Sequence, residues 1–229
     1  NITIFNVTIY NFSTQIHIQD SNVTNITNVT LQTRVRSGPL LINLQNVNHT
    51  TIANNYFVVN TSAAAVTMNS LFKSIGLNIT NNYLNRTNNS NVVGFQLMNI
   101  SGGIFSSNTL IDFASSGGTV LIAGVDNMNF SSNIIYTGGG GSLGIAYDLQ
   151  GQGVVENNTF TNDNITAFGI SSPIFLNSFS QGECTSGDCV RNNYFINVNI
   201  SSNSSNGSAE INDASAANVS NYLIYNNSF

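Results

Sequence analysis

One six-residue pattern of apolar and polar positions recurs along the chain: apolar, any residue, Asn or Ser, Asn, any residue, apolar. Its seven copies span residues 52–57, 79–84, 105–110, 130–135, 155–160, 190–195 and 224–229. The invariant Asn is therefore Asn55, Asn82, Asn108, Asn133, Asn158, Asn193 and Asn227, with spacings of 27, 26, 25, 25, 35 and 34 residues. Short β-type segments that repeat about every 25 residues are typical of the coils of a parallel β-helix.

Each coil is expected to supply about three short strands. Every strand pairs in parallel with its equivalent one coil away, at a spacing of about 4.8 Å. Apolar runs at 40–44, 93–97 and 120–122 supply strands that precede the motif. We therefore predict an all-β parallel solenoid of eight or nine coils, with about 25 residues per coil.

The seven invariant Asn residues are predicted to form an internal ladder. Asn tolerates the left-handed backbone conformation that a sharp bend requires, and stacked Asn side chains hydrogen-bond from coil to coil. None of the seven begins an N-glycosylation triplet. This agrees with a buried, structural column.

The pattern divides the chain into two regions. Residues 1–39 match the motif poorly and are predicted to be divergent coils or an added strand, whereas residues 40–229 form the solenoid. Loop insertions are expected near 180–190 and 200–215, where the period lengthens. The sequence ends inside a repeat, so we expect either a longer protein or an end that another subunit covers.

Composition excludes several classes of protein. Charged residues make up 7% of the chain, the net charge is −5, and five Lys and Arg residues cannot neutralise a phosphate backbone. The apolar residues are spread too evenly for a transmembrane segment. No signal peptide or lipid anchor is visible.

Asn-x-Ser/Thr triplets are twice as frequent as the composition predicts. The 41 Asn, 28 Ser and 20 Thr residues would give about nine triplets by chance, and the sequence contains 20. We predict an extracellular, N-glycosylated protein, although an Asn- and Thr-rich β protein also generates triplets by composition. The candidate acceptors are Asn1, Asn6, Asn11, Asn22, Asn25, Asn28, Asn48, Asn60, Asn78, Asn85, Asn88, Asn99, Asn129, Asn157, Asn164, Asn199, Asn203, Asn206, Asn218 and Asn226.

Two cysteines fit an extracellular location. Cys184 and Cys189 bracket a turn-like segment, and we expect a disulfide that closes a small loop. A metal pair is the alternative, but His17 and His49 are distant in sequence and are expected on the surface. We predict neither a metal site nor a cofactor.

The Asn motif resembles the right-handed parallel β-helix superfamily, the pectate-lyase-like fold with an Asn ladder at one turn. The resemblance covers about residues 40–229 and implies the fold more strongly than a function, because the superfamily includes lyases, hydrolases, tailspikes, adhesins and surface proteins. Its lyases use Arg or Lys beside Asp clusters, and its hydrolases use paired Asp residues. Here Asp112, Asp126 and the other acids share no register relative to the Asn column, so the sequence predicts no carboxylate pair and no enzyme.

Two smaller features follow from the repeat. Glu156 and Arg191 both lie two residues before a column Asn, so we predict an ion pair between adjacent coils. Tyr56, Tyr83 and Tyr194 each follow a column Asn and are candidates for an aromatic stripe on one outer wall, although tyrosines in such a register more often simply stack on each other along the ladder.

The predicted function is a structural extracellular glycoprotein of a cell-surface layer, sheath, filament or virion surface, assembled by head-to-tail stacking. A carbohydrate- or receptor-binding adhesin or spike module is the alternative, and a polysaccharide lyase or hydrolase is the third. An archaeal surface protein of a hot acidic setting fits the low charge, and a eukaryotic or viral glycoprotein fits the triplets.

Overall fold

The computed structural model describes residues 1–12, 14–33, 40–59, 64–87, 93–113, 117–139, 142–147, 154–169, 172–176, 190–203, 211–213, 219–220 and 223–225. All regular secondary structure in these ranges is β-strand, and each strand pairs in parallel with its neighbours. Equivalent residues of successive turns are about 26 positions apart over much of the chain. The protein is an all-β parallel solenoid, as the repeat predicts. The described ranges contain no helix that is long and apolar enough to cross a membrane.

The strands form a 17-stranded sheet and an 8-stranded sheet. The larger sheet comprises β1 (Ile2–Phe5), β3 (Thr14–Gln19), β4 (Thr24–Thr27), β6 (Leu40–Gln45), β7 (Thr50–Ala53), β9 (Ala64–Thr80), β11 (Phe95–Ser106), β13 (Gly117–Ser131), β15 (Ser142–Tyr147), β16 (Val155–Glu156), β17 (Thr159–Thr161), β19 (Ser172–Leu176), β20 (Val190–Arg191), β21 (Tyr194–Ile196), β23 (Ile211–Asp213), β24 (Val219–Ser220) and β25 (Leu223–Tyr225). The smaller sheet comprises β2 (Thr8–Tyr10), β5 (Thr30–Thr33), β8 (Tyr56–Val59), β10 (Tyr83–Arg86), β12 (Thr109–Asp112), β14 (Ile134–Gly139), β18 (Asn164–Gly169) and β22 (Asn199–Asn203).

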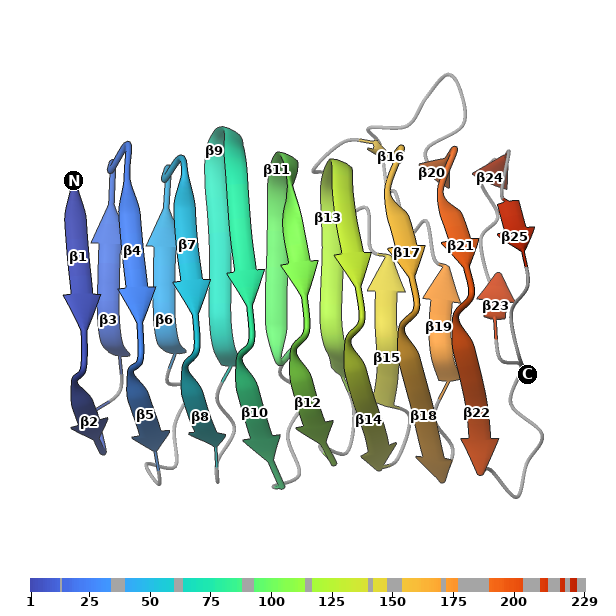
Figure 1. Cartoon of the computed structure of the whole chain (residues 1–229), viewed down its shortest axis with the longest axis horizontal. Coiled ribbons are helices and arrows are strands. Elements are labelled where there is room, and N and C mark those ends of the chain that lie inside the picture. Colours follow the sequence, from blue (N-terminus) through green and yellow to red (C-terminus); the bar gives the residue numbers. More distant parts are fainter. Residues whose placement is uncertain are drawn as a thin grey trace.

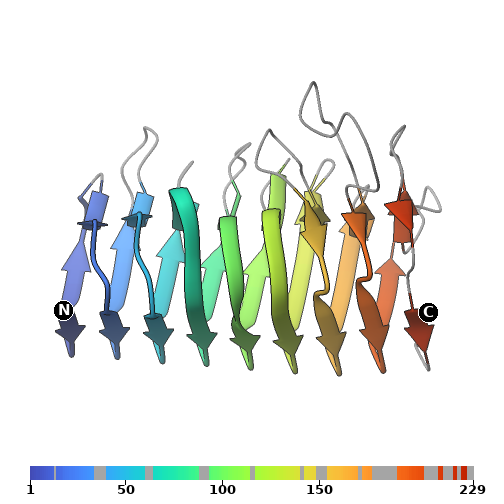
Figure 2. The same cartoon turned by 90° about the horizontal axis from the view of Figure 1, so that it is seen from above.

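The larger sheet bends round a corner, so that the solenoid has three walls (Figures 1 and 2). Strand β9 shows the bend, because it pairs with β6 near its start and with β7 at its end. We call the wall that contains β3, β6, β15 and β19 the first wall, and the wall that contains β1, β4, β7, β17 and β21 the second. The smaller sheet is the third wall. Strands β16, β20 and β24 lie at the corner between the first two walls.

Apolar columns fill the space between the walls. Along the second wall, isoleucines of β4, β7 and β9 are followed by Phe105, Phe130, Phe160 and Phe195, all buried and in register. The centroids of the last three rings are 4.5 and 4.8 Å apart. This spacing is close to the rung spacing of about 4.8 Å in a parallel sheet, so the aromatic rings stack along the axis.

The sharp bend between the second and third walls has a repeated backbone geometry. The residue in the left-handed conformation is the one before the column residue, for example Asn54 (φ 57°) before Asn55 and Asn81 (φ 54°) before Asn82. The sequence pattern predicts that the column Asn performs both tasks. The structure separates them: one polar residue makes the bend, and the next, buried residue makes the side-chain contacts.

A chain of side-chain amides runs along this bend. The main-chain N–H and the Nδ2 of Asn55 both donate to Oδ1 of Asn82, at 3.1 and 3.0 Å, and Asn82 bonds to Asn108 in the same way. Asn108 bonds to Asn133, with both distances 3.0 Å. Asn133 then donates to Oδ1 of Asp163, at 2.8 and 2.9 Å.

The prediction of a single column of seven Asn residues is therefore wrong. Asn158 and Asn193 bond to each other, at 3.1 and 3.0 Å, at a different corner, the one between the first and second walls. Asn227 lies outside the described residues.

The cause is a change of register. Ile122 pairs with Tyr147 on the first wall, a step of 25 residues, whereas Asp126 pairs with Glu156, a step of 30. Five additional residues between Tyr147 and Glu156 shift the motif from one bend to the other, although the spacing between the Asn residues remains 25.

Gaps in the described ranges interrupt the turns. The number of turns that the described residues trace without a gap is smaller than the predicted eight or nine coils. Strands β1 to β5, from the first 39 residues, pair in register with later strands of both sheets. The expected insertions near 180–190 and 200–215 lie largely outside the described residues, as do Cys184 and Cys189.

Candidate functional site

A row of polar side chains lies at the corner between the first and second walls. Ser101 pairs with Asp126, Asp126 with Glu156, and Glu156 with Arg191, on four successive turns. We call these four residues the corner row. Since register partners on adjacent parallel strands are about 4.8 Å apart and point to the same side, the two carboxylates are direct neighbours.

This carboxylate pair is not apparent from the spacing of the Asn motif. Asp126 lies seven residues before Asn133, whereas Glu156 lies two residues before Asn158, so an alignment on the Asn motif separates them. The 30-residue step brings them together.

Each carboxylate has its own hydrogen-bond partners. The hydroxyl of Ser101 and the Nδ2 of Asn127 both donate to Oδ1 of Asp126, at 2.5 and 2.8 Å. The Nε of Arg191 donates to Oε2 of Glu156 at 2.5 Å, which confirms the predicted ion pair. The Arg191 and Glu156 side chains are 42% and 25% exposed, whereas Asp126 is 6% exposed. The corner row is therefore a partly desolvated carboxylate beside one that is open to solvent and paired with a cation.

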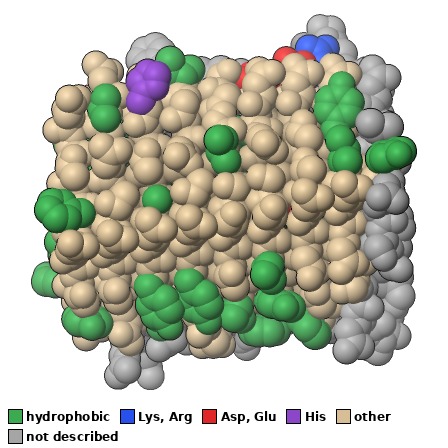
Figure 3. Space-filling view, in the orientation of Figure 1, with side chains coloured by type: hydrophobic (Ala, Val, Ile, Leu, Met, Phe, Trp, Pro, Cys, Tyr) green, Lys and Arg blue, Asp and Glu red, His purple; other side chains and the backbone are tan. Residues whose placement is uncertain are grey.

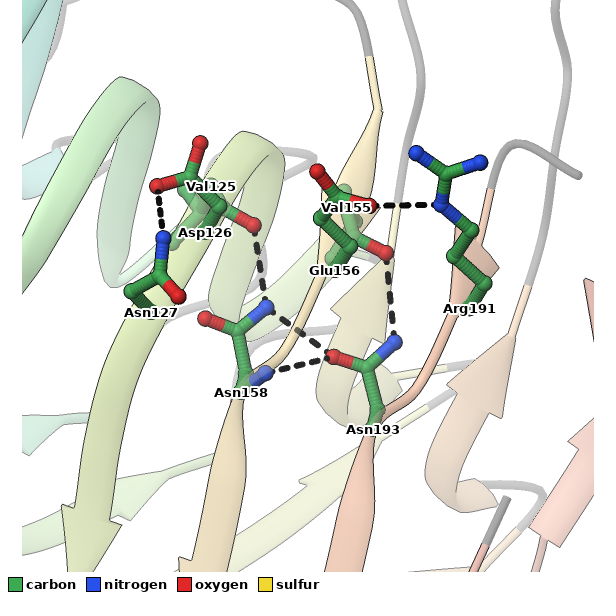
Figure 4. A network of polar contacts seen from close by, with 8 residues as sticks. All are labelled: Val125, Asp126, Asn127, Val155, Glu156, Asn158, Arg191 and Asn193. Atoms are coloured by element: carbon green, nitrogen blue, oxygen red, sulfur yellow. Dashed lines mark hydrogen bonds and ion pairs between the residues drawn. The ribbon is translucent and has the colours of Figure 1, made fainter. Parts of the chain in front are cut away.

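Buried amides fix the backbone beneath the corner row (Figure 4). The Nδ2 of Asn158 donates to the carbonyl oxygen of Val125 at 2.9 Å, and the Nδ2 of Asn193 donates to that of Val155 at 3.2 Å. These carbonyls belong to the residues immediately before Asp126 and Glu156. Two carboxylates on strands that are pinned in this way are pre-organised for chemistry, because their positions do not depend on mobile loops.

The other acids and bases identified in the sequence do not join the corner row. Asp112 is buried in an ion pair with Arg86, and Asp163 receives the end of the Asn chain. Asp148, Asp188, Arg34 and Arg36 lie outside the described residues. His17 and His49 are exposed, as predicted. No group of three or more His, Cys, Asp or Glu side chains that could hold a metal ion occurs in the described ranges.

The predicted aromatic stripe is shorter than expected. Tyr56 and Tyr83 stack on the third wall, with ring centroids 4.9 Å apart and an interplanar angle of 4°. Tyr194 belongs to β21 of the second wall and pairs with Thr159, so it is not part of this stripe. The same register change that divides the Asn residues moves Tyr194 to another wall.

The candidate glycosylation sites differ in exposure. Asn1, Asn6, Asn11, Asn22, Asn28, Asn129, Asn157 and Asn199 are exposed, and Asn25, Asn48, Asn78, Asn85, Asn99 and Asn164 are half-buried. The side chains of the remaining six candidates lie outside those that the structure describes. The Oδ1 atoms of Asn78 and Asn85 are inaccessible to solvent. Glycosylation itself stays a prediction.

Comparisons with known proteins give architecture only. No family model and no curated protein matches the sequence. Among solved structures, two of the catalytic domain of a GH87 alpha-1,3-glucanase in complex with nigerose are similar, with a TM-score of 0.44 and 15% and 14% identity. They cover 99% of this chain, which spans 49% of theirs. The enzymatically active domain of bacteriophage CBA120 tailspike protein 2 has a TM-score of 0.35 and 9% identity, over 91% of this chain and 41% of its own.

The prediction that the chain is not an enzyme is corrected. It depended on the absence of two neighbouring carboxylates, and Asp126 and Glu156 are such a pair.

Proposed function

We propose that this chain is a carbohydrate-active β-solenoid that cleaves a glycosidic bond at the corner row. The observation that carries the proposal is the register pairing of Asp126 with Glu156, beside Arg191. Glycoside hydrolysis requires two carboxyl groups, about 5–5.5 Å apart for retention of configuration and about 6.5–9.5 Å apart for inversion. Adjacent rungs of a parallel sheet are about 4.8 Å apart, which is close to the shorter of these two separations.

The contacts assign different roles to the two groups. Glu156, which pairs with the guanidinium of Arg191, acts as nucleophile on the sugar carbon. The proton for the departing oxygen then comes from Asp126. In the second step Asp126 takes a proton from the attacking water, and the bond between Glu156 and the sugar breaks.

The substrate class follows from the surrounding surface. Figure 3 shows a wide face of uncharged side chains, with charged groups confined to its upper edge. An uncharged wall attracts no polyanion, so the proposed substrate is a neutral polysaccharide. Such polymers occur outside cells and on cell surfaces, and we propose an extracellular or virion-surface location for this chain.

The decisive experiment measures the release of reducing ends from a panel of neutral polysaccharides that includes an α-1,3-glucan, with a uronic-acid polymer for comparison. We expect turnover of a neutral polymer by the unaltered chain and a loss of at least about 100-fold in D126N and E156Q. The matched control is D20N, which alters an exposed acid outside the corner row. If no polymer is cleaved, or if D20N loses as much activity as D126N, the hydrolytic assignment is rejected.

Binding without cleavage is the second candidate function, as expected of an adhesin or spike module. The stacked tyrosines on the third wall, of which Tyr56 is exposed and Tyr83 half-buried, favour it. Retention of the unaltered chain on an immobilised polysaccharide, with no release of sugar, would support this candidate. The predicted head-to-tail assembly into a layer or filament stays a prediction, and no contact of the described residues supports a purely structural role.

A further inference from the structure

The outer face of the third wall carries an apolar band. Residues 1 and 3 of each strand point outward, since residue 2 of every strand from β5 to β22 is buried in the core. On β8, β10, β12 and β14 six of these eight outward positions are aromatic or aliphatic: Tyr56, Val58, Tyr83, Ile111, Ile134 and Tyr136. We call these six residues the third-wall band; apolar side chains gather over these strands in Figure 3.

The tyrosine stack leaves the outer aromatic face of Tyr56 open. The 4.9 Å between the rings of Tyr56 and Tyr83 matches the spacing of adjacent rungs, so the rings stack along the solenoid axis. Tyr83 covers one face of Tyr56. The register partner on the other side is Thr30, whose side chain is too short to cover the second face. Tyr56 is accordingly 45% exposed.

The surroundings of this face are polar and uncharged. Thr30 and Gln32 occupy the outward positions of β5, and Asn85 and Thr109 are the two polar positions among the strands of the band. The Oδ1 of Asn85 has no hydrogen-bond partner. The outward positions of the strands from β2 to β22 contain no charged residue. An aromatic face with hydroxyl and amide groups beside it suits a ligand that has apolar C–H faces and neutral hydroxyl edges.

We propose that Tyr56 and Tyr83 form a binding platform for a neutral saccharide, with one sugar ring on the free face of Tyr56 above Thr30. The site lies on the third wall and shares no residue with the corner row. The proposal depends on the proposed function only for the class of ligand, a neutral saccharide. The platform would hold a polymer on the protein without cleaving it. A second copy of the chain is the competing occupant, which the experiment separates.

The experiment measures binding of neutral oligosaccharides of four to six sugars, α-1,3-linked glucose oligomers among them, by calorimetry. It uses E156Q as the parent chain, so that hydrolysis does not consume the ligand. Y56A is expected to bind about tenfold more weakly than the parent, equivalent to about 1.4 kcal/mol. Y56F keeps the ring and is expected to bind within about twofold of the parent. Y194A, which removes an exposed tyrosine from the second wall, is the matched control and leaves binding unchanged.

Three results would overturn the proposal: no binding of any oligosaccharide, equal affinity in the parent and Y56A, or an equal loss in Y194A. A parent chain that sediments as a dimer and becomes monomeric only in Y56A would assign the band to self-association instead. The platform residues Tyr56 and Tyr83 belong to the third wall, whereas Asp126 and Glu156 lie at the corner between the first and second walls. Failure of the platform therefore leaves the corner row untouched, and the reverse also holds.

Discussion

Replacement of Asp163 by Asn should stabilise the protein at neutral pH and have little effect in acid. Asp163 occupies the position that Asn133 and its predecessors hold on earlier turns, and it is buried. Its Oδ1 accepts two hydrogen bonds from Asn133, but its Oδ2 has no partner. On the four preceding turns the equivalent atom is the Nδ2 of an Asn, which donates to a main-chain carbonyl, as Asn133 does to Phe105 at 2.9 Å. An ionised carboxylate cannot make this bond.

The magnitude follows from the pKa. Burial raises the pKa of Asp163 from 3.8 to about 6, against the opposing effect of the hydrogen bonds that it accepts from Asn133. The folded state therefore binds the proton more tightly than the unfolded state. The resulting stability is fully present below pH 4 and is lost as the pH rises to about 6. A difference of about two pKa units corresponds to roughly 3 kcal/mol.

The assay is denaturant unfolding of the unaltered chain and D163N at pH 3.5 and pH 7.5. We expect similar free energies of unfolding at pH 3.5, and at pH 7.5 an advantage for D163N of up to roughly 3 kcal/mol. D20N controls for the general effect of removing an acid, and it should not change the difference between the two pH values. A D163N variant that gains equally at both pH values, or an unaltered chain whose stability does not fall between pH 4 and 6, would refute the reasoning.

Three further predictions concern other parts of the chain. A double-mutant cycle between Glu156 and Arg191 should give a coupling energy below about 1 kcal/mol, because both side chains are partly exposed, and a coupling of several kcal/mol would contradict this. Arg86→Leu should destabilise the protein by about 3–5 kcal/mol, because it leaves Asp112 buried without its cation; thermal unfolding should show that adding Asp112→Leu recovers most of the loss. Mass spectrometry of the natural protein should find glycans at exposed acceptor triplets but not at Asn85, and an intact mass near 24.5 kDa would remove the glycoprotein hypothesis.

The sequence predicted the class of fold because the inward positions carry a strong physical signal. Each turn must place apolar residues at the same inward positions, and only a short-stranded parallel stack gives a period near 25 residues with such columns. The bend also leaves a signature, since a polar residue in the left-handed conformation must precede a buried one. These constraints act on every turn, so seven copies of the motif were enough to recognise the solenoid.

The register could not be predicted from the same motif, because two different bends have the same local requirements. On one turn the Asn motif predicts that Asn157–Asn158 form the bend between the second and third walls. In the structure Asn162–Asp163 form this bend. A sequence motif that also allows Asp or Val at the buried position would have matched Asn162–Asp163 and Asn28–Val29. The candidate site was missed for the same reason, because it exists only when Asp126 and Glu156 are paired across the longer step.

The buried pair of Arg86 and Asp112 has a consequence for how the chain finds its correct order of turns. In a stack of similar coils, a strand that docks one rung too early or too late still meets matching apolar columns, so misassembly costs little. Arg86 is fully buried on β10 and donates to Asp112 on β12 at 2.8 and 2.5 Å. Any arrangement that separates these two strands would bury two unpaired charges, at a cost of several kcal/mol. This ion pair contributes modestly to the stability of the folded protein. Its main effect is to favour the pairing of β10 with β12 over incorrect pairings of similar strands.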